Sequence, residues 1–458
     1  MTIFLKKYWL LIAVFIIFAF LRFYNLDQRI IFDWDQEQYS YQVEKIIKGD
    51  ITLIGPRINN DTGFFLGPYF TYILVPFYLL RNLHPTALID FVETYSIIFF
   101  ITSYLVISKL FSKKHALMFL LLWSGNSLLV VYDTLPWNPL LIPLGIILVW
   151  LYLYKIFKSP NYKNFAILGL IMGFFSNIHF QFIFLIFFCF VMLMLNFKNK
   201  KLFNIKNGAT FIASFFTMFL PLFVFDLRNN FLNSKLFFTF FFNNQSNFVR
   251  DRNVWTTVFT NFLKPFIYLE RLDYMWLFLF IIAGITIFLI KKKKSFDKSF
   301  YISFLLVLFI TPLVFYFYSV RPSEYYFLYL LPFVLITITD FIFTLKREYL
   351  FILLVVYFLA FNIDSLQRNM KQIPIGLYYK DKAIKTLKEN INISKKFNVT
   401  IDAPLGFHNG YKYLLDWYEI PQSGDFKDPL IQIKLPPEKV DFKINDAIGL
   451  KIPKAVRK

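Results

Sequence analysis

The chain has 458 residues, of which 57% are hydrophobic, 22% aromatic and only 17% charged, and its mean hydropathy is +0.53. A soluble domain of this length could not bury so much apolar surface, so the composition predicts a polytopic membrane protein. The formal net charge of +20 does not indicate nucleic-acid binding, because Lys and Arg lie mostly in short loops between apolar runs. The single cysteine, Cys189, excludes an intrachain disulfide.

The chain begins with Lys6 and Lys7, followed by an apolar run over about Tyr8–Tyr24. No small-residue cleavage site follows, so we interpret the run as an uncleaved span rather than a signal peptide. An acidic cluster comes next, Asp33-Trp34-Asp35-Gln36-Glu37. Carboxylates at a bilayer surface gain nothing from burial in lipid. If the cluster faces a cavity, it is a candidate general base at the mouth of a membrane enzyme.

The first long loop, 25–87, predicts two helices at the membrane surface. Within 35–48, four residues recur at helical spacing and predict a helix lying along the membrane: Tyr39, Val43, Ile46 and Ile47. The segment Gly67–Leu80 is apolar, but it carries Pro76 and is shorter than the roughly twenty residues that a span needs. We interpret it as an interfacial or re-entrant helix.

The basic loops predict the topology. Clusters occur at Lys6–Lys7, 109–115, 155–163, 198–206, 291–294 and 346–347. If each is cytoplasmic, two spans separate successive clusters. Eleven spans result, with the N-terminus inside and the C-terminus outside the cytoplasmic membrane. They are 8–24, 88–107, 116–131, 140–154, 165–178, 180–197, 208–225, 275–290, 300–318, 325–343 and 349–361.

Hydrophobicity falls after Asn362, which predicts a transmembrane domain over 1–366 and a small extracytoplasmic domain over 367–458. In the latter, 381–390 has a helical pattern, and 398–401 and 431–435 have strand patterns, so we expect an α+β module. The fold class is therefore an all-α polytopic membrane protein with juxtamembrane helices and a small external domain.

The predicted topology brings polar residues from distant loops to one membrane face, as a site at the bilayer surface requires. The alternative is that external loops are simply polar. The candidates are Asp33, Asp35, Glu37, Arg57, Asp61, Asp133, Trp137, Asn138, His179, Gln181, Asp226, Arg228, Arg321 and Glu324.

Four motifs, in order over the first 180 residues, resemble membrane glycosyltransferases of the GT-C fold, in the protein-mannosyltransferase and aminoarabinose-transferase-like branch. They are the acidic cluster, a Leu-Ile-Gly-Pro segment (53–56) followed by Gly63-Phe64-Phe65-Leu66-Gly67-Pro68-Tyr69, Trp137-Asn138-Pro139, and Asn177-Ile178-His179. The resemblance does not cover the C-terminal domain.

The resemblance implies transfer of a sugar from a polyprenyl-phosphate donor to a glycan, lipid or protein acceptor on the external face, with inversion. A carboxylate must then deprotonate the acceptor hydroxyl. By match to the family's acidic position, Asp35 is the expected base, with Asp33 as the alternative. On a helix, Asp33 and Glu37 share a face and Asp35 points elsewhere. Glu37 is expected to orient the acceptor or to cap the following helix.

The other candidates have a functional and a structural interpretation each. Asp133 supports the base or is a turn residue before Pro136. Trp137, in its motif with Asn138, stacks on a sugar or anchors the interface. His179 binds the donor or is structural. For the phosphate, Arg321 is the best placed cation and Arg57 and Arg228 are weaker candidates, while Glu324 binds substrate or pairs with Arg321.

No cofactor is required by these residues. A carboxylate pair could bind a divalent ion, although no His/Cys cluster exists and the branch that the chain resembles is metal-free. Two other functions stay open. A lipid-linked glycan flippase would carry more charge within its spans, and an O-antigen ligase or polymerase would rely on Arg and His in a late loop. In the C-terminal domain, Trp417 and Tyr418 are either sugar platforms or its small core.

Overall fold

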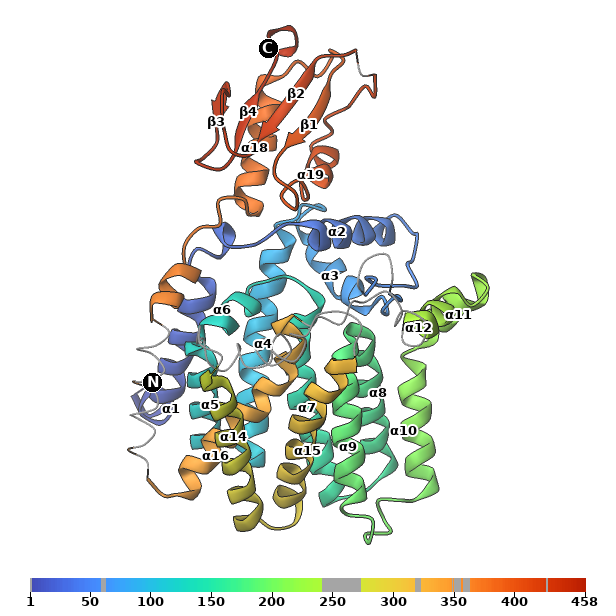
Figure 1. The fold of residues 1–458 in the computed structure, drawn as a ribbon, viewed down its shortest axis with the longest axis vertical. Coiled ribbons are helices and arrows are strands. Elements are labelled where there is room, and N and C mark those ends of the chain that lie inside the picture. The colour runs from blue at the N-terminus through green and yellow to red at the C-terminus, as the bar shows by residue number, and fades with distance from the viewer. Residues whose placement is uncertain are drawn as a thin grey trace.

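The computed structural model describes residues 2–58, 63–240, 273–317, 323–347, 349, 356, 363–425 and 427–458. These residues form a bundle of mostly upright helices with a small α+β domain on one end (Figure 1). We call the end of the bundle that carries this domain the capped end. The predicted fold class is confirmed.

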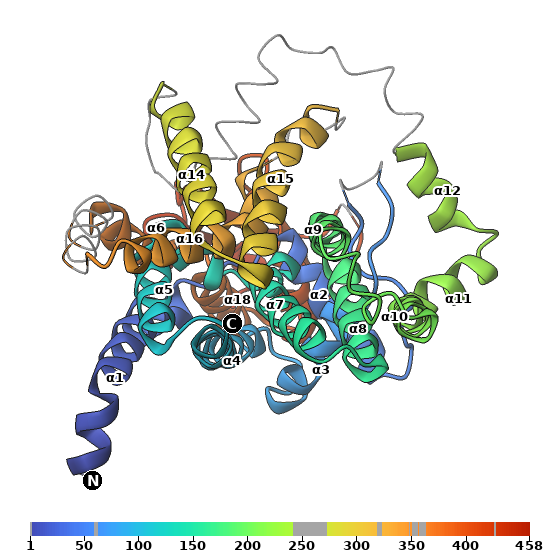
Figure 2. The same cartoon turned by 90° about the horizontal axis from the view of Figure 1, so that it is seen from below.

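The bundle is built from helices that pack in chain order and across it. They are α1 (Thr2–Phe23), α4 (Ala87–Leu110), α5 (Lys113–Gly125), α6 (Ser127–Asp133), α7 (Ile142–Lys158), α8 (Tyr162–Ile178), α9 (Ile183–Met194), α10 (Ile205–Thr217), α14 (Asp273–Lys292), α15 (Ser295–Phe317) and α16 (Leu331–Thr344). Helix α8 packs between α7 and α10, α15 packs against α9 and α14, and α5 packs against α1, α4 and α16. Two short helices, α11 (Leu220–Arg228) and α12 (Leu232–Phe238), project beyond α10 (Figure 2).

Among the described residues, five helices are long and apolar enough to cross a membrane, or up to seven if each of two bent pairs is one span. The bent pairs correct the sequence prediction. The predicted span 116–131 bends by 83° between α5 and α6, and the predicted span 208–225 bends by 55° between α10 and α11. Asn126 caps α6, and Pro221 stands in the first turn of α11, so each bend has a helix-start signal. The predicted span 349–361 lies almost entirely outside the described residues.

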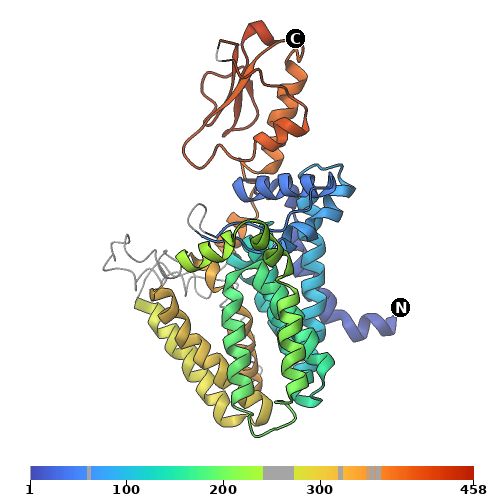
Figure 3. The ribbon, with the colours of Figure 1, turned by 90° about the vertical axis from the view of Figure 1, so that its right-hand side faces the viewer.

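The first loop supplies the two expected surface helices. Helix α2 (Trp34–Ile47) lies across the capped end, beneath the C-terminal domain (Figure 3). Helix α3 (Tyr69–Leu80) has only 12 residues and contains Pro76, as the short-helix interpretation requires. Tyr39 and Val43 of α2 are buried against the bundle core, which explains the apolar positions at helical spacing.

The C-terminal domain packs α18 (Leu377–Asn390) and the short α19 (Lys412–Trp417) with a four-stranded sheet of order β1-β2-β4-β3. Strands β1 (Asn398–Asp402) and β2 (Leu430–Lys434) match the two predicted strands within one residue at each end, and they run parallel to each other. Strand β4 (Gly449–Lys451) is antiparallel to both β2 and β3 (Phe442–Lys443). Its buried side chains, such as Ile384 and Ile431, form one continuous cluster with the bundle core.

Candidate active site

The acidic cluster starts α2, with Asp33 at the N-cap position. The backbone N–H of Asp33 donates to Gln36 Oε1 at 3.1 Å, which fixes the first turn of the helix. One side of α2 is tied to the turn after α6. Gln36 Nε2 donates to the carbonyl of Pro136 at 3.2 Å, and the Tyr39 hydroxyl donates to Asn138 Oδ1 at 3.0 Å.

The two outer carboxylates of the cluster face the C-terminal domain. Glu37 is 6% exposed, and its Oε1 accepts the backbone N–H of Tyr413 at 3.0 Å. Burial lowers the pKa of Lys380 to about 8, and Asp33 lies close enough to the lysine that its negative charge, together with that of Glu37, opposes this shift. Glu37 lies in the first turn of α2, as the expectation of an acidic residue at the start of this helix requires, and its carboxylate also binds the backbone at the start of α19.

Asp35 has a different environment. It is exposed to solvent, and among the described residues its carboxylate makes no hydrogen bond and no ion pair. It stands one turn before Tyr39, on the side of α2 that meets the turn after α6. Crowding by the surrounding protein reduces its hydration and, with the negative charge of Asp33, raises the pKa of Asp35 to about 6.

Below this side of α2, aromatic rings from four segments form a continuous group, which we call the aromatic cluster: Tyr132, Trp137, His179, Tyr325 and Tyr326. The rings of Tyr132 and Trp137 stack at 5.4 Å, and those of Trp137 and Tyr325 lie 4.7 Å apart. His179 lies 6.1 Å from Tyr325 and 5.7 Å from Tyr326. The aromatic cluster thus joins the turn after α6, the end of α8 and the 3-10 helix Glu324–Leu330.

Three predicted residues hold this arrangement together. Asn138 Nδ2 donates to the carbonyl of Ile178 at 2.6 Å, which ties the Trp137 turn to the end of α8. Glu324 Oε1 accepts the Tyr132 hydroxyl at 2.8 Å. His179 ends α8, and its Nδ1 accepts the backbone N–H of Gln181 at 3.3 Å. The structure therefore brings Trp137, Asn138, His179 and Glu324 together, and the bond from Tyr39 to Asn138 connects this group to α2 one turn after Asp35.

Asp133 lies apart from Asp35. It is 6% exposed, and its Oδ2 is 2.6 Å from Arg22 Nη2 and 2.8 Å from Trp123 Nε1. These contacts join the end of α6 to α1 and α5, so Asp133 has a structural role, and its support of the base stays a prediction. Its partner Arg22 is fully buried and was missed, although a charged residue inside a predicted span is a signal in itself.

The candidate cations are also separated. Arg57 Nε donates to the carbonyl of Gly63 at 2.7 Å, and its guanidinium carbon lies 5.5 Å from the centre of the Phe65 ring. Arg228 is exposed at the end of α11. Asp226, also in α11, accepts the backbone N–H of Asn233 in the first turn of α12 at 2.6 Å. Arg321 and Asp61 lie outside the described residues.

A cavity of about 610 Å³ is lined in part by Phe65, the residue whose ring lies near the Arg57 guanidinium, although Arg57 itself does not line it. Its walls come from residues 64–67, the end of α8 and α10–α12, and they are mostly phenylalanine side chains such as Phe65, Phe219 and Phe223. Asn177 Oδ1 and Ser176 Oγ border it without a hydrogen-bond partner in the described part of the chain. Within that part, no three His, Cys, Asp or Glu side chains are close enough to hold a metal ion.

Comparison with known proteins gives a fold and no sequence relative. No protein-family model matches the chain, and no curated protein matches it. Two solved structures of ArnT from Cupriavidus metallidurans are similar. The one bound to undecaprenyl phosphate has a TM-score of 0.57 and 10% identity over 93% of this chain and 92% of that chain. The apo state has a TM-score of 0.59 and 11% identity over 100% and 98%. The chain therefore has the fold of ArnT, which is the GT-C fold that its motifs predicted.

Proposed function

We propose that the chain is an inverting membrane glycosyltransferase that moves a sugar from a polyprenyl-phosphate donor to an acceptor hydroxyl at the capped end. The observation that carries this proposal is the difference between the three carboxylates of the acidic cluster. Asp33 and Glu37 face the C-terminal domain, whereas Asp35 is exposed and, among the described residues, unpaired. A carboxylate with its pKa raised to about 6 accepts a proton readily near neutral pH.

The chemical step is a single displacement. Asp35 removes the proton of the acceptor hydroxyl as the acceptor oxygen bonds to the anomeric carbon of the sugar. The bond from that carbon to the donor phosphate oxygen breaks, and its electron pair leaves with the lipid phosphate. Attack from the face opposite to the leaving group inverts the anomeric centre. The acceptor is a hydroxyl-bearing glycan, lipid or protein, and the sugar is a hexose or a pentose.

The apolar cavity and Arg57 suit the donor. A cavity of about 610 Å³ with phenylalanine walls suits an apolar lipid chain, and the Arg57 guanidinium, which lies near the ring of the wall residue Phe65, suits a phosphate. One of the ArnT structures with this fold is bound to undecaprenyl phosphate, which supports a lipid phosphate as the donor's carrier. We assign Arg321 to the same phosphate as a proposal from the sequence.

The aromatic cluster suits the sugar. The partly buried Trp137 ring, stacked on Tyr132, provides an apolar platform, while Asn138, His179 and Glu324 provide polar groups close to it. The bond from Tyr39 to Asn138 connects these residues to α2 one turn after Asp35, and we infer that a sugar held there is close to the proposed base.

The test is turnover of radiolabelled undecaprenyl-phosphate sugars, one hexose and one pentose, by the full chain in proteoliposomes with envelope acceptors. Asp35→Asn should lower turnover at least about 100-fold, the usual contribution of a general base. Asp50→Asn makes the same chemical change at an exposed position after α2 and is the matched control. Asp33→Asn should lose far less than Asp35→Asn.

Three results would contradict the proposal. Full turnover by Asp35→Asn would exclude it as the base, and a larger loss in Asp33→Asn would move that role to Asp33. Passage of the lipid-linked sugar across the bilayer by the wild-type chain, without any transfer, would favour a transporter.

A further inference from the structure

The backbone that leads into the acidic cluster is held by the C-terminal domain. Three alternate carbonyls of this segment accept hydrogen bonds from the start of α18 and the turn before it. The carbonyl of Gln28 accepts the N–H of Ile373 at 2.9 Å, and that of Ile30 accepts the N–H of Leu377 at 2.9 Å. The third carbonyl, that of Phe32, accepts from the Lys380 ammonium at 2.7 Å.

Lys380 is the most unusual member of this contact, because it is a lysine that is only 2% exposed. Its ammonium joins the two parts of the molecule, since it also donates to the carbonyl of Asn409 at 2.7 Å in the C-terminal domain. The Tyr411 ring lies 5.1 Å from the ammonium. Burial lowers the pKa of Lys380 to about 8, while the charges of Asp33 and Glu37 oppose that shift. A buried cation bound by carbonyls from both parts of the molecule fixes the geometry of the groups around it.

Gly410 of the C-terminal domain also makes a close approach to the backbone of Phe32, which only glycine allows. Its φ is +80°, and a Cβ at this position would lie 2.2 Å from the carbonyl oxygen of Phe32. Only glycine permits both the conformation and the contact. On the other side of Asp35, the bond from Tyr413 to Glu37 repeats the attachment at the next turn of α2. The C-terminal domain therefore holds the chain on both sides of Asp35.

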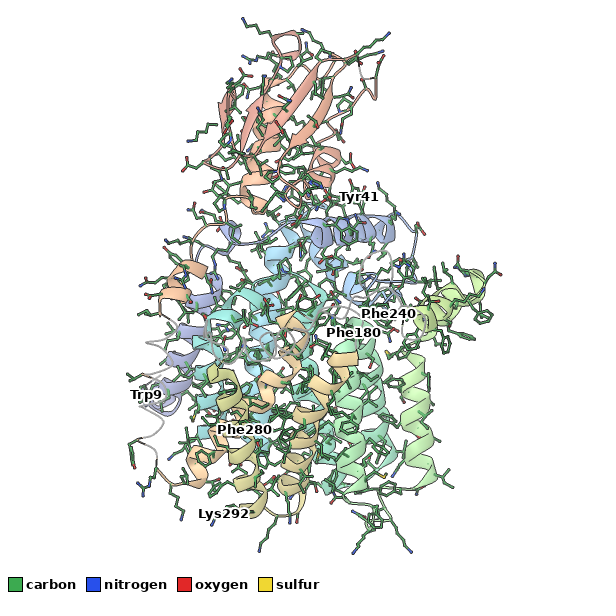
Figure 4. The ribbon with its side chains drawn as sticks, viewed as in Figure 1. Trp9, Tyr41, Phe180, Phe240, Phe280 and Lys292 are labelled. Carbon is green, nitrogen blue, oxygen red and sulfur yellow. The ribbon has the colours of Figure 1, made fainter. Side chains whose placement is uncertain are left out.

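A second set of contacts fixes the position of the C-terminal domain on the helix bundle. Tyr413 Oη donates to the carbonyl of Leu83 at 2.8 Å, and Trp417 Nε1 donates to that of Asn82 at 3.0 Å. His84 Nε2 lies 3.0 Å from Asp381 Oδ1, which also accepts the Tyr418 hydroxyl. Tyr41 donates to Asp416 at the same junction, where Figure 4 labels it. Trp417 and Tyr418 thus pack against the hydrophobic core, as one of the two predictions for them requires, and they also take part in the contact between the domain and the bundle.

We propose that the C-terminal domain positions the base-bearing start of α2, and that Lys380 and Glu37 are the positioning residues through which it does so. This inference rests on the proposed function only where it concerns turnover. The attachment itself is a physical contact that can be measured without any substrate. Positioning of a base matters greatly, because a misplacement of about 1 Å lowers a rate on the order of 100-fold.

The test compares Lys380→Met with Lys382→Met, which removes an exposed lysine from the same helix. Hydrogen exchange of peptides covering 30–41 should rise in Lys380→Met and stay at the wild-type level in Lys382→Met. Turnover in Lys380→Met should fall by about 10- to 100-fold in kcat, while the KM for the polyprenyl-phosphate sugar changes less than about threefold.

Glu37 provides a second pair of variants that does not depend on the buried lysine. Glu37→Gln keeps an oxygen that accepts the Tyr413 N–H, whereas Glu37→Leu removes it. Glu37→Gln should retain most of the wild-type kcat and exchange protection, and Glu37→Leu should lose both. Equal losses in the two variants would mean that the negative charge of Glu37, and not its attachment, is what counts, and this would overturn the proposal.

The exchange measurement separates this inference from the proposed function. Unchanged exchange over 30–41 in both Lys380→Met and Glu37→Leu would overturn the positioning role, whatever the turnover. If the wild-type chain shows no turnover, increased exchange in these variants still supports the attachment, and only the proposed function fails. A loss of kcat without increased exchange would also contradict positioning.

Discussion

At the scale of single residues, the raised pKa of Asp35 has two consequences of opposite sign. The base acts only when ionised, so kcat/KM should rise with pH through about 6 and level off above it. The stability of the folded protein should instead fall as the pH rises and Asp35 ionises. The ordinary pKa of an aspartate is 3.8, and the folded state holds the proton more tightly. Ionisation of Asp35 therefore costs stability, and this cost develops between about pH 4 and pH 6 and remains at higher pH.

Asp35→Asn should accordingly raise the midpoint of thermal unfolding at pH 8 and have little effect at pH 4.5. The measurement is thermal unfolding of the purified protein in detergent at both values of pH, with Asp50→Asn as the control. A stability gain that is the same at both values would show that ionisation of Asp35 is not its cause.

The sequence predicts part of the site at this scale. The spacing of four residues between Asp33 and Glu37 places them on one helix face and Asp35 on another, which the structure bears out in the different contacts of Glu37 and Asp35. The partner of Glu37 could not be predicted, because the contact to Tyr413 joins positions 376 residues apart. Lys380 likewise carries no signal in a stretch that contains several other lysines.

At the scale of elements, surface helices are predicted well and breaks in spans are not. Helix α2 follows from its apolar spacing, and α3 follows from its length and Pro76. The 83° bend between α5 and α6 leaves no pattern in hydrophobicity, because both halves are apolar. Its stabilisation comes from elsewhere in the chain. Arg22 of α1 donates to the carbonyls of Trp123 and Ser124 at the end of α5 and to Asp133 at the end of α6.

Arg22→Met should therefore destabilise the protein by about 3–5 kcal/mol, since it leaves the Asp133 carboxylate buried without its counter-ion. Arg81→Met provides the matched control, because it breaks the exposed pair with Asp90 and should cost less than about 1 kcal/mol. The measurement is denaturant unfolding in detergent. The double variant Arg22→Met with Asp133→Leu should recover part of the loss, and no recovery would mean that the carbonyl contacts dominate.

At the scale of the whole molecule, basic loop residues gather at one end of the helix bundle. The basic segments between α7 and α8, α9 and α10, and α14 and α15 lie at the end opposite to the C-terminal domain, where Figure 4 labels Lys292. The sequence predicts two spans between successive basic clusters, which requires these clusters to lie at the same end of the bundle, as they do here. By the positive-inside rule we therefore expect this end to face the cytoplasm and the capped end, with Asp35, to face outward.

Labelling of single cysteines with a membrane-impermeant maleimide in intact cells checks this orientation. The only native cysteine, Cys189, is buried and should not react, so the wild-type chain provides the background. Lys396→Cys, on the exposed surface of the C-terminal domain, should be labelled without permeabilisation. Lys292→Cys should be labelled only after the membrane is opened. The reverse pattern would place Asp35 in the cytoplasm, where the proposed transfer at the external face cannot take place, whereas the expected pattern leaves the base, the aromatic cluster and the domain that holds them on the outer side.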